Sequence, residues 1–269
     1  MGSGIAEVIA KSGIDVVIRS RSQETADATK NAIENSLKKQ LAKSKITQEQ
    51  LDAAMSHVCV TSKLEDLANC DLIIESVAED LATKKELFAA LDKAVKPSCI
   101  LSTNTSTLPV IEMAKVTNRP DKVCGIHFFN PAVLMPLVEV VRPITASDET
   151  IALANSFVAA CTKDAVQVVD RAGFIVNALL FPYLNNAIAM FEAGTATMED
   201  IDVAMKGGCN FPMGPFALLD LVGLDTSVAI LNALHAEFKS VNLEPRPMLK
   251  KLVSEGKLGR KTKQGFYSY

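Results

Sequence analysis

The sequence lacks several features that would assign it to common protein classes. It contains no run of about 18 apolar residues, the length that would read as a membrane span, and it does not open with the basic and apolar segments of a secretory signal. Its 28 lysines and arginines stand against 31 acidic residues, so the formal charge of −3 offers no basic face for nucleic acid. These absences predict a soluble, cytoplasmic protein with neither a membrane nor a nucleic-acid partner.

The sequence also lacks a pattern for holding a metal or forming disulfides. Only three histidines are present, and none lies near the cysteines in a ligand pattern. No two cysteines have C-x-x-C spacing, and several lie in apolar runs, where a thiol usually behaves as a small hydrophobic group. We therefore expect no metal site and six reduced, buried thiols, at Cys59, Cys70, Cys99, Cys124, Cys161 and Cys209.

Two regimes of pattern divide the chain. Up to residue 169, short β-branched runs alternate with helical stretches such as Gln23–Lys43 and Leu81–Val95, which predicts a mostly parallel sheet of βαβ units. From residue 170 to 269 helical patterns dominate, beginning with Phe174–Glu192, where Pro182 should lie in the first turns or produce a kink. The strand-like runs include Val16–Ile18, Leu72–Ile74, Cys99–Ser102, Val123–Ile126 and Leu137–Val141. The expected fold is a doubly wound α/β domain followed by an all-α domain.

A long helical hairpin is predicted at residues 23–55, after the first strand-like run. It is longer than a normal crossover between strands and carries Lys30, Lys38, Lys39, Lys43 and Lys45. These lysines are either a solvated face or a docking surface for an anionic ligand.

The first residues resemble the end of a dinucleotide-binding fingerprint. Such a fold opens with a strand, then G-x-G-x-x-G, then a helix whose N-terminus holds the pyrophosphate. Here Ser3–Ser12 already reads as that helix, with Gly13 as its C-terminal cap, and Gly2 fits the last glycine of the fingerprint. We therefore expect the first strand to be missing and Met1 to be an internal methionine of a longer chain.

The acidic residue of the dinucleotide fingerprint is also missing. It is expected about 20 residues into the motif, at the end of the second strand, where this sequence has Arg19-Ser20-Arg21. Arginine can pair with a 2′-phosphate that a carboxylate would repel, which favours NADP over NAD. The alternative is that Arg19 and Arg21 are surface residues at a strand end.

His127 and Glu139 are candidate partners in acid–base chemistry. His127 follows a predicted strand, and the carboxyl ends of parallel strands are where ligands bind in such sheets. Glu139 lies in the apolar run Leu137–Val141, where a buried carboxylate needs a partner such as an imidazole. A carboxylate on the ring fixes the tautomer of a catalytic histidine. Glu139 could instead point to solvent from an edge strand.

Two polar segments lie where a site needs them. Ser102–Thr107 follows another predicted strand, although one of its residues could simply cap a helix beginning at Leu108. The second segment, Asp170–Asn177, spans the predicted domain junction, and clefts between domains are favoured ligand sites. Asn177 could also be an ordinary polar helix residue.

The ordered set of motifs resembles the 3-hydroxyacyl-CoA dehydrogenase family along almost the whole chain. The motifs are the segments at 104–106, 127–131, 137–140, 170–177, 210–216 and 261–267. Because no hydratase region is attached, the likeness is to the short monofunctional 3-hydroxybutyryl-CoA dehydrogenases.

The resemblance implies a role for individual residues. His127 would be the general acid/base, oriented by Glu139, and Ser106 and Asn177 would hydrogen-bond the reacting oxygen and the thioester. Ser36 and Lys43 would contact CoA, and a homodimer would form through the C-terminal helical domain. The implied contacts to the nicotinamide cofactor are Glu79, Lys84, Ser106, Asn130 and Lys261, beside the candidates Gly2, Arg19, Ser20 and Arg21.

The sequence therefore predicts an oxidoreductase that interconverts (3S)-3-hydroxyacyl-CoA and 3-oxoacyl-CoA with NADP or NAD, NADP being favoured, on short acyl chains. One alternative is a non-catalytic protein, either crystallin-like or an inactive truncated member of the family. Another is a dehydrogenase of free hydroxy acids, against which the lysine-bearing hairpin and the His127–Glu139 pair both count.

Overall fold

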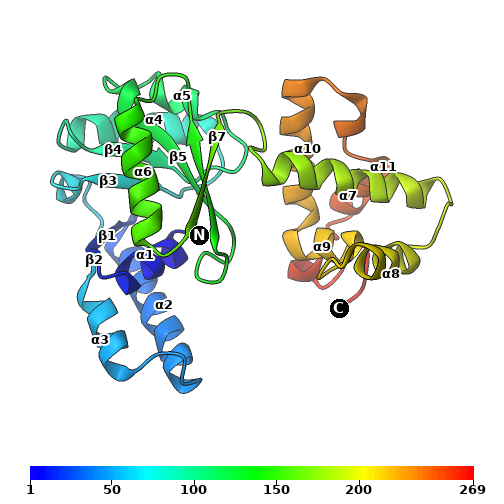
Figure 1. The fold of residues 1–269 in the computed structure, drawn as a ribbon, viewed down its shortest axis with the longest axis horizontal. Coiled ribbons are helices and arrows are strands. Elements are labelled where there is room, and N and C mark those ends of the chain that lie inside the picture. The colour runs from blue at the N-terminus through cyan, green and yellow to red at the C-terminus, as the bar shows by residue number, and fades with distance from the viewer. The chain divides into compact units, whose positions relative to one another are not determined.

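The computed structural model describes all residues, Met1–Tyr269, which form two compact units, Met1–Asp170 and Arg171–Tyr269. All strands belong to the first unit, and the second is helical (Figure 1). The predicted fold class, a doubly wound α/β part followed by an all-helical part, is confirmed.

The first unit alternates strands with helices along the chain. Its strands are β1 (Val16–Arg19), β2 (Val58–Thr61), β3 (Leu72–Glu75), β4 (Ile100–Thr103), β5 (Val123–Phe128), β6 (Leu137–Arg142) and β7 (Asp164–Val169). Its helices are α1 (Gly2–Lys11), α2 (Gln23–Ala42), α3 (Gln48–Ser56), α4 (Leu81–Ala94), α5 (Val110–Ala114) and α6 (Asp148–Ala160), with the short 3-10 turns η1 (Glu65–Leu67) and η2 (Pro120–Lys122).

The strands form two hydrogen-bonded groups, β1-β2 and β3-β4-β5-β6-β7. Every pair is parallel except β5–β6, so the prediction of a mostly parallel sheet is confirmed. The ladder breaks between β1 and β3, where the usual doubly wound order places the strand that precedes the first helix.

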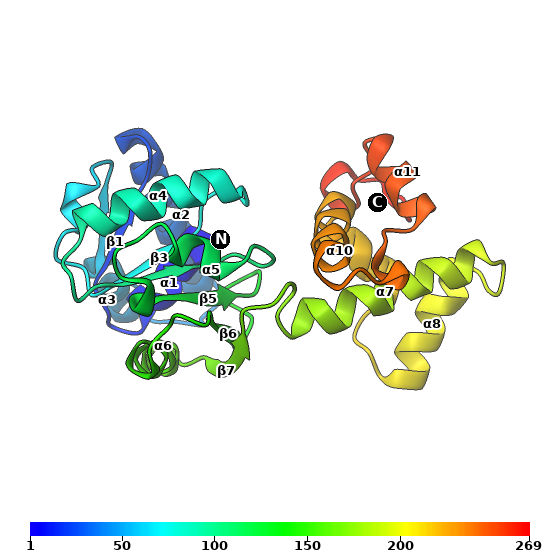
Figure 2. The same cartoon turned by 90° about the horizontal axis from the view of Figure 1, so that it is seen from above.

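Helices cover both faces of the larger sheet. Because side chains alternate along a strand, Cys124 and Ile126 of β5 face the core shared with α1 and α6. On the other face, a Cβ added to Gly125 would come within 3.2 Å of Val110 in α5, which shows how closely that helix packs. Figure 2 shows α4 and α6 on opposite sides of the sheet. His127, two residues after Gly125, therefore belongs to the α4/α5 side.

The helix at the N-terminus is close to its prediction. It runs from Gly2 to Lys11 rather than from Ser3 to Ser12. Gly13 follows it with φ of 73° and donates its N–H to Ala10, as expected of a glycine after a helix end.

The predicted helical hairpin is formed by α2 and α3. Ser22 and Thr47 cap the two helices through their hydroxyls, and Thr47 completes a capping box with Gln50. The hairpin packs against α1 through a cluster that includes Ile33, Leu37 and Leu51. Its lysines are half-buried at residue 30 and exposed at residues 38, 39, 43 and 45.

The second unit is built around its own buried core of aliphatic and aromatic side chains. The predicted first helix, Phe174–Glu192, begins two residues later, and Pro182 lies inside it. The helices are α7 (Val176–Glu192), α8 (Met198–Cys209), α9 (Pro215–Val222), α10 (Leu224–Phe238) and α11 (Pro247–Ser254), with the 3-10 turns η3 (Val241–Leu243) and η4 (Arg260–Thr262).

No single helix of the chain is long and apolar enough to cross a bilayer. Only α9 and α10 taken together pass that test of length and composition, and the pair is bent by 98°.

The six cysteines form no disulfide, but they do not share one environment. Cys99, Cys124 and Cys161 are buried as expected, and burial raises the pKa of the Cys124 thiol to about 12. The expected burial is wrong for Cys59 and Cys209, which are exposed. Cys59 lies at an outward position of the edge strand β2, and Cys209 ends α8.

Candidate functional site

His127 and Glu139 form a buried pair between β5 and β6. The two residues are directly opposite in the antiparallel register, and His127 Nδ1 lies 2.7 Å from a Glu139 carboxylate oxygen. The side chains are 7% and 0% exposed, so the alternative that Glu139 points to solvent is wrong. A carboxylate accepts hydrogen bonds, so Nδ1 of His127 is the donor in this pair.

Asn104 fixes the strand next to this histidine. Its side-chain oxygen accepts a hydrogen bond from the backbone N–H of Phe128 at 2.8 Å. The backbone N–H of Asn104 donates to the Glu75 carbonyl, also at 2.8 Å. Asn104 therefore ties the end of β4 to the end of β5, where His127 lies. The sequence analysis included Asn104 in a family motif but assigned it no role. Its position directly after a predicted strand could have suggested one.

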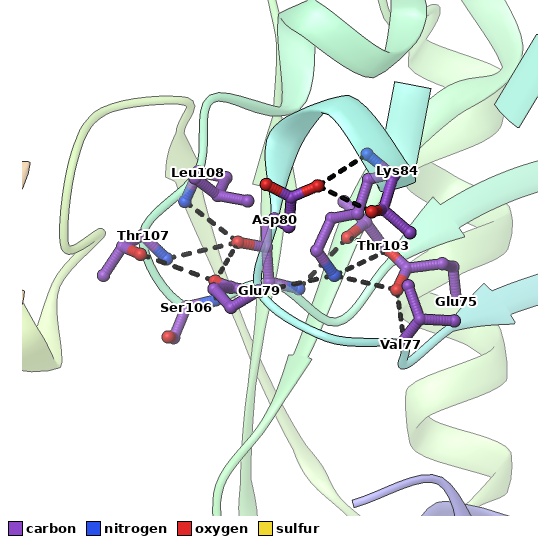
Figure 3. Close-up of polar contacts among 11 residues, drawn as sticks. Glu75, Val77, Glu79, Asp80, Lys84, Thr103, Ser106, Thr107 and Leu108 are labelled. Carbon is purple, nitrogen blue, oxygen red and sulfur yellow. Dashed lines mark hydrogen bonds and ion pairs between the residues drawn. The ribbon is translucent and has the colours of Figure 1, made fainter. Parts of the chain in front are cut away.

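The turn that carries Ser106 is held by Glu79. One Glu79 oxygen accepts the Thr105 hydroxyl at 2.5 Å and the Ser106 backbone N–H at 3.0 Å, and the Thr107 hydroxyl lies 3.4 Å from the same oxygen. Figure 3 shows Glu79 reaching across to this turn from the segment before α4. Ser106 itself is half-buried.

Lys84 and Glu75 form a buried ion pair beside Glu79. Lys84 is 1% exposed, and its Nζ lies 2.8 and 2.9 Å from the two Glu75 oxygens and 3.3 Å from Glu79. Glu75 also accepts the Val77 N–H and the Thr103 hydroxyl, so its charge is fully compensated (Figure 3). The structure thus brings three predicted residues, Glu79, Lys84 and Ser106, into one network.

The expected helix at Leu108 begins later, at Val110, and its cap comes from elsewhere. Asp170 accepts the N–H groups of Val110 and Ile111 at 3.0 and 2.7 Å. Thr105 accepts the N–H of Leu108 at 2.9 Å, which closes the turn before the helix. The expectation that a residue of Ser102–Thr107 caps this helix is therefore wrong. The N-cap residue is Pro109, whose side chain cannot accept a hydrogen bond, and Asp170 provides the cap from a distant part of the sequence.

The N-terminus of α1 has features that suit a nicotinamide cofactor. Met1 provides no side-chain cap, so the first N–H groups of this ten-residue helix have no capping side chain. A Cβ on Gly2 would lie 3.6 Å from Ser76, and the buried Ser76 hydroxyl has no hydrogen-bond partner. Free helix amides and an unpaired hydroxyl fit a ligand that carries phosphate groups.

The segment predicted to favour NADP over NAD, residues 19–21, lies at the end of β1. Arg19 and Arg21 are exposed on either side of the half-buried Ser20, whose N–H donates to the Thr61 carbonyl at 3.0 Å. Both arginines are thus exposed, and this three-residue segment contains no carboxylate that would repel a phosphate.

Ser36 and Asn130 line one pocket of about 220 Å³, together with Met1 and Gly4 at the start of α1. Lys43 follows α2 as its C-cap residue and is exposed. It lies seven positions after Ser36, which places the two on the same face of the helix two turns apart. The pocket is thus lined by Asn130, which is predicted to contact the cofactor, and by Ser36, which is predicted to contact CoA.

Asn177 and Lys261 belong to the second unit. Asn177 is the second residue of α7 and is 8% exposed. Lys261 lies in η4, and its ammonium contacts both oxygens of Asp225 at 2.6 and 2.5 Å. Burial alone would raise the pKa of Asp225, but the hydrogen bond from Lys261 and nearby backbone N–H groups lower it below its ordinary value.

The segment that carries Lys261 is held by Asp220. This aspartate is 1% exposed and accepts the backbone N–H groups of Phe266 and Tyr267 at 2.9 and 2.8 Å. The Tyr269 hydroxyl lies 3.1 Å from the same carboxylate. Sequence reasoning missed Asp220, whose acidic side chain in the apolar run of α9 was the signal.

Comparison with known proteins agrees with this architecture. Residues 1–171 match the NAD binding domain of 3-hydroxyacyl-CoA dehydrogenase, and residues 173–269 match its C-terminal domain. The 3-hydroxybutyryl-CoA dehydrogenase of Mycobacterium tuberculosis is 43% identical over 271 residues, covering 100% of this chain and 95% of that protein. The mitochondrial hydroxyacyl-coenzyme A dehydrogenase of Homo sapiens is 41% identical over 278 residues, covering 100% and 88%.

A solved structure agrees with the fold along the whole chain. The crystal structure of (S)-3-hydroxybutyryl-CoA dehydrogenase from Ralstonia eutropha superposes with a TM-score of 0.97 at 35% identity, covering 100% of this chain and 95% of that one. With both family domains matched in order and relatives above 40% identity, this chain belongs to the 3-hydroxyacyl-CoA dehydrogenase family.

Proposed function

We propose that this protein is a dehydrogenase that interconverts (3S)-3-hydroxyacyl-CoA and 3-oxoacyl-CoA by hydride transfer with a nicotinamide cofactor. The observation that carries the proposal is the buried His127–Glu139 pair, set on the sheet of a domain that matches an NAD-binding family. Relatives named 3-hydroxybutyryl-CoA dehydrogenase support a short acyl chain.

His127 is the proposed general acid/base. An alcohol is too weak an acid to ionise alone near neutrality, so removal of hydride from C3 requires a base for the hydroxyl proton. In oxidation that proton passes to Nε2 of His127, and in reduction Nε2 returns it to the carbonyl oxygen. Glu139 holds the ring through Nδ1 and stabilises the imidazolium form. The nicotinamide, when bound, accepts or delivers the hydride.

Ser106 and Asn177 are the proposed binding partners of the reacting oxygen and the thioester. A hydroxyl and a side-chain amide both donate hydrogen bonds, and a carbonyl oxygen that gains negative charge accepts them more strongly. Ser106 lies on a turn whose backbone is anchored by Glu79, which supports this assignment.

The proposed cofactor residues come from several segments of the chain. Gly2 at the uncapped start of α1 suits the pyrophosphate, and Asn130 lines the pocket beside that helix end. Glu79, Lys84 and Lys261 are carried over from the family resemblance. Arg19, Ser20 and Arg21 support NADP over NAD, because exposed guanidinium groups can pair with a 2′-phosphate.

Ser36 and Lys43 are the proposed contacts to CoA. Their common face on α2 and the exposed lysines around them form a cationic surface suited to the phosphates of a nucleotide. The docking interpretation of the hairpin lysines is therefore preferred to a merely solvated face.

We also propose a homodimer through the C-terminal helical unit and a cytoplasmic location. Exposed apolar side chains in that unit, among them Leu179, Val203 and Leu221, support a protein partner.

Oxidation of NADH and NADPH in the presence of acetoacetyl-CoA tests the function, with free acetoacetate as the matched substrate that lacks CoA. We expect turnover of the thioester, loss of turnover in His127→Gln, and little or no turnover of the free acid. Preference for the free acid would favour the hydroxy-acid dehydrogenase. Failure to bind or oxidise either cofactor in the folded protein would favour the non-catalytic alternative.

A further inference from the structure

Phe129 contacts the imidazole ring of His127. It directly follows β5, two residues after the histidine, and the two ring centroids lie 4.6 Å apart with the ring planes tilted by 54°. In a strand, residues two apart point to the same face of the sheet with roughly 6.6 Å between their Cα atoms, so these two rings lean toward each other. The separation lies in the range at which neighbouring rings attract.

Glu139 and Phe129 hold the imidazole in different ways. The χ2 torsion of a histidine is broad, so the strand by itself does not set the rotation of the ring. Glu139 binds Nδ1 from β6, and an imidazole N–H points along the plane of its ring. Phe129 packs against the ring at a tilt and adds contacts that one hydrogen bond does not supply. Together the two contacts restrict both the position of Nδ1 and the tilt of the ring.

The two phenylalanines that follow His127 have different surroundings. Phe128 is 2% exposed and belongs to the core shared with α1 and α6. Phe129 is half-buried, and it projects from a backbone that Asn104 fixes through the N–H of Phe128. Core packing explains a large apolar side chain at Phe128. At Phe129 the contact with the imidazole is the explanation that the geometry offers.

We propose that Phe129 is a positioning residue that, together with Glu139, holds the imidazole of His127 in the orientation needed for proton transfer. The inference rests on the proposed function, in which His127 is the general acid/base. Orientation matters because a group misplaced by about 1 Å can cost 10²-fold in rate, and a functional side chain keeps its rotamer only when its neighbours lock it.

Phe129→Leu removes the aromatic ring and keeps an apolar side chain. In acetoacetyl-CoA reduction at saturating substrates we expect kcat to fall on the order of 10- to 100-fold, because the imidazole is no longer held in place. The KM values for acetoacetyl-CoA and for the nicotinamide cofactor should stay within about twofold of the parent values, since Phe129 acts through His127. A raised KM with kcat retained would overturn the proposal, as would constants that do not change.

Phe129→Tyr is the conservative variant, because it keeps the ring at a half-buried position where a hydroxyl can reach solvent. It should retain most of the parent kcat, and a loss as large as that of Phe129→Leu would contradict the proposal. Phe157→Leu is the matched control, since it makes the same change at a half-buried phenylalanine of α6 that packs against the other face of the sheet. An equal fall of kcat in this folded control would reduce the effect to a general loss of packing.

Exchange of the His127 Nδ1 proton with solvent tests the positioning without reference to turnover. Its NMR signal is identified by its absence from His127→Gln. In Phe129→Leu the exchange should accelerate about tenfold or more, because a ring that tilts freely breaks its hydrogen bond to Glu139 more often. In Phe157→Leu it should not change.

Unchanged exchange in Phe129→Leu would overturn the proposal even if kcat falls. Accelerated exchange in Phe129→Leu, in a protein whose parent binds cofactor but never reduces acetoacetyl-CoA, would retain the restraint on His127 and reject the proposed function.

Discussion

His127 and Glu139 lie directly opposite each other on β5 and β6, with 2.7 Å between Nδ1 and a carboxylate oxygen. Both residues come from otherwise apolar strands, and the antiparallel register is what brings them together. The sequence contains a second pair of this kind, His57 and Asp15, with the same 2.7 Å separation but with the aspartate 91% exposed. Burial therefore distinguishes the two pairs more clearly than distance does.

Glu139→Gln keeps the size of the side chain and removes its charge. We expect kcat to fall on the order of 10²- to 10⁴-fold, because the imidazolium loses its compensating carboxylate and the ring loses its fixed tautomer. Asp15→Asn alters the exposed pair in the same way and should leave kcat unchanged. Comparable activity in Glu139→Gln and the parent, with both folded by circular dichroism, would remove Glu139 from the proposed chemistry.

Ser20→Asp places a carboxylate at the end of β1, between Arg19 and Arg21. The ratio of kcat/KM for NADPH to that for NADH should fall on the order of 10- to 100-fold, because the new charge repels a 2′-phosphate and can pair with a ribose hydroxyl. Arg21→Ala should shift the ratio in the same direction. Arg142→Ala, which removes an exposed arginine paired with Asp148, is the control. A ratio that does not change in Ser20→Asp would contradict the assignment of this segment to the cofactor.

Lys43→Ala should raise the KM for acetoacetyl-CoA by roughly 3- to 10-fold while kcat is retained, since an exposed charge on a phosphate provides binding energy in ground and transition states alike. The effect should weaken with added salt. Acetoacetyl-pantetheine lacks the nucleotide and serves as the matched substrate, for which the KM should not change. An equal rise in KM for both substrates would place Lys43 away from the CoA phosphates.

Gly265→Ala tests the anchoring of the C-terminal segment. A Cβ at this position would overlap the Asp220 carboxylate, which is buried and already accepts two backbone N–H groups. We expect the free energy of unfolding of the second unit to fall by about 2–4 kcal/mol, measured by urea denaturation. Gly208→Ala is the control, because nothing lies within 4 Å of its Cβ and the helix α8 should gain about 0.5–1 kcal/mol. Equal stability of the two variants would show that the Asp220 site can rearrange without cost.

Elements governed by local pattern were predicted closely. The helices expected at Gln23–Lys43 and Leu81–Val95 each differ from α2 and α4 by one residue at the C-terminal end. Their apolar spacing and their caps, Ser22 and Asp80, are properties of a few adjacent residues. The strand β5 was expected to stop at Ile126 but continues to Phe128, because its last residues pair with β6 and not with the parallel neighbour.

By itself, the sequence determined the order of strands and helices, the change to an all-helical second part, and the set of polar residues that follow strands. Only the tertiary structure decided which of these residues meet. The cap of α5 comes from Asp170, the turn at Ser106 is held by Glu79, and Asn104 supports the strand of His127. Local propensity depends on neighbours along the chain, whereas each of these hydrogen bonds joins residues at least 24 positions apart, and its geometry is set by the packing of the sheet.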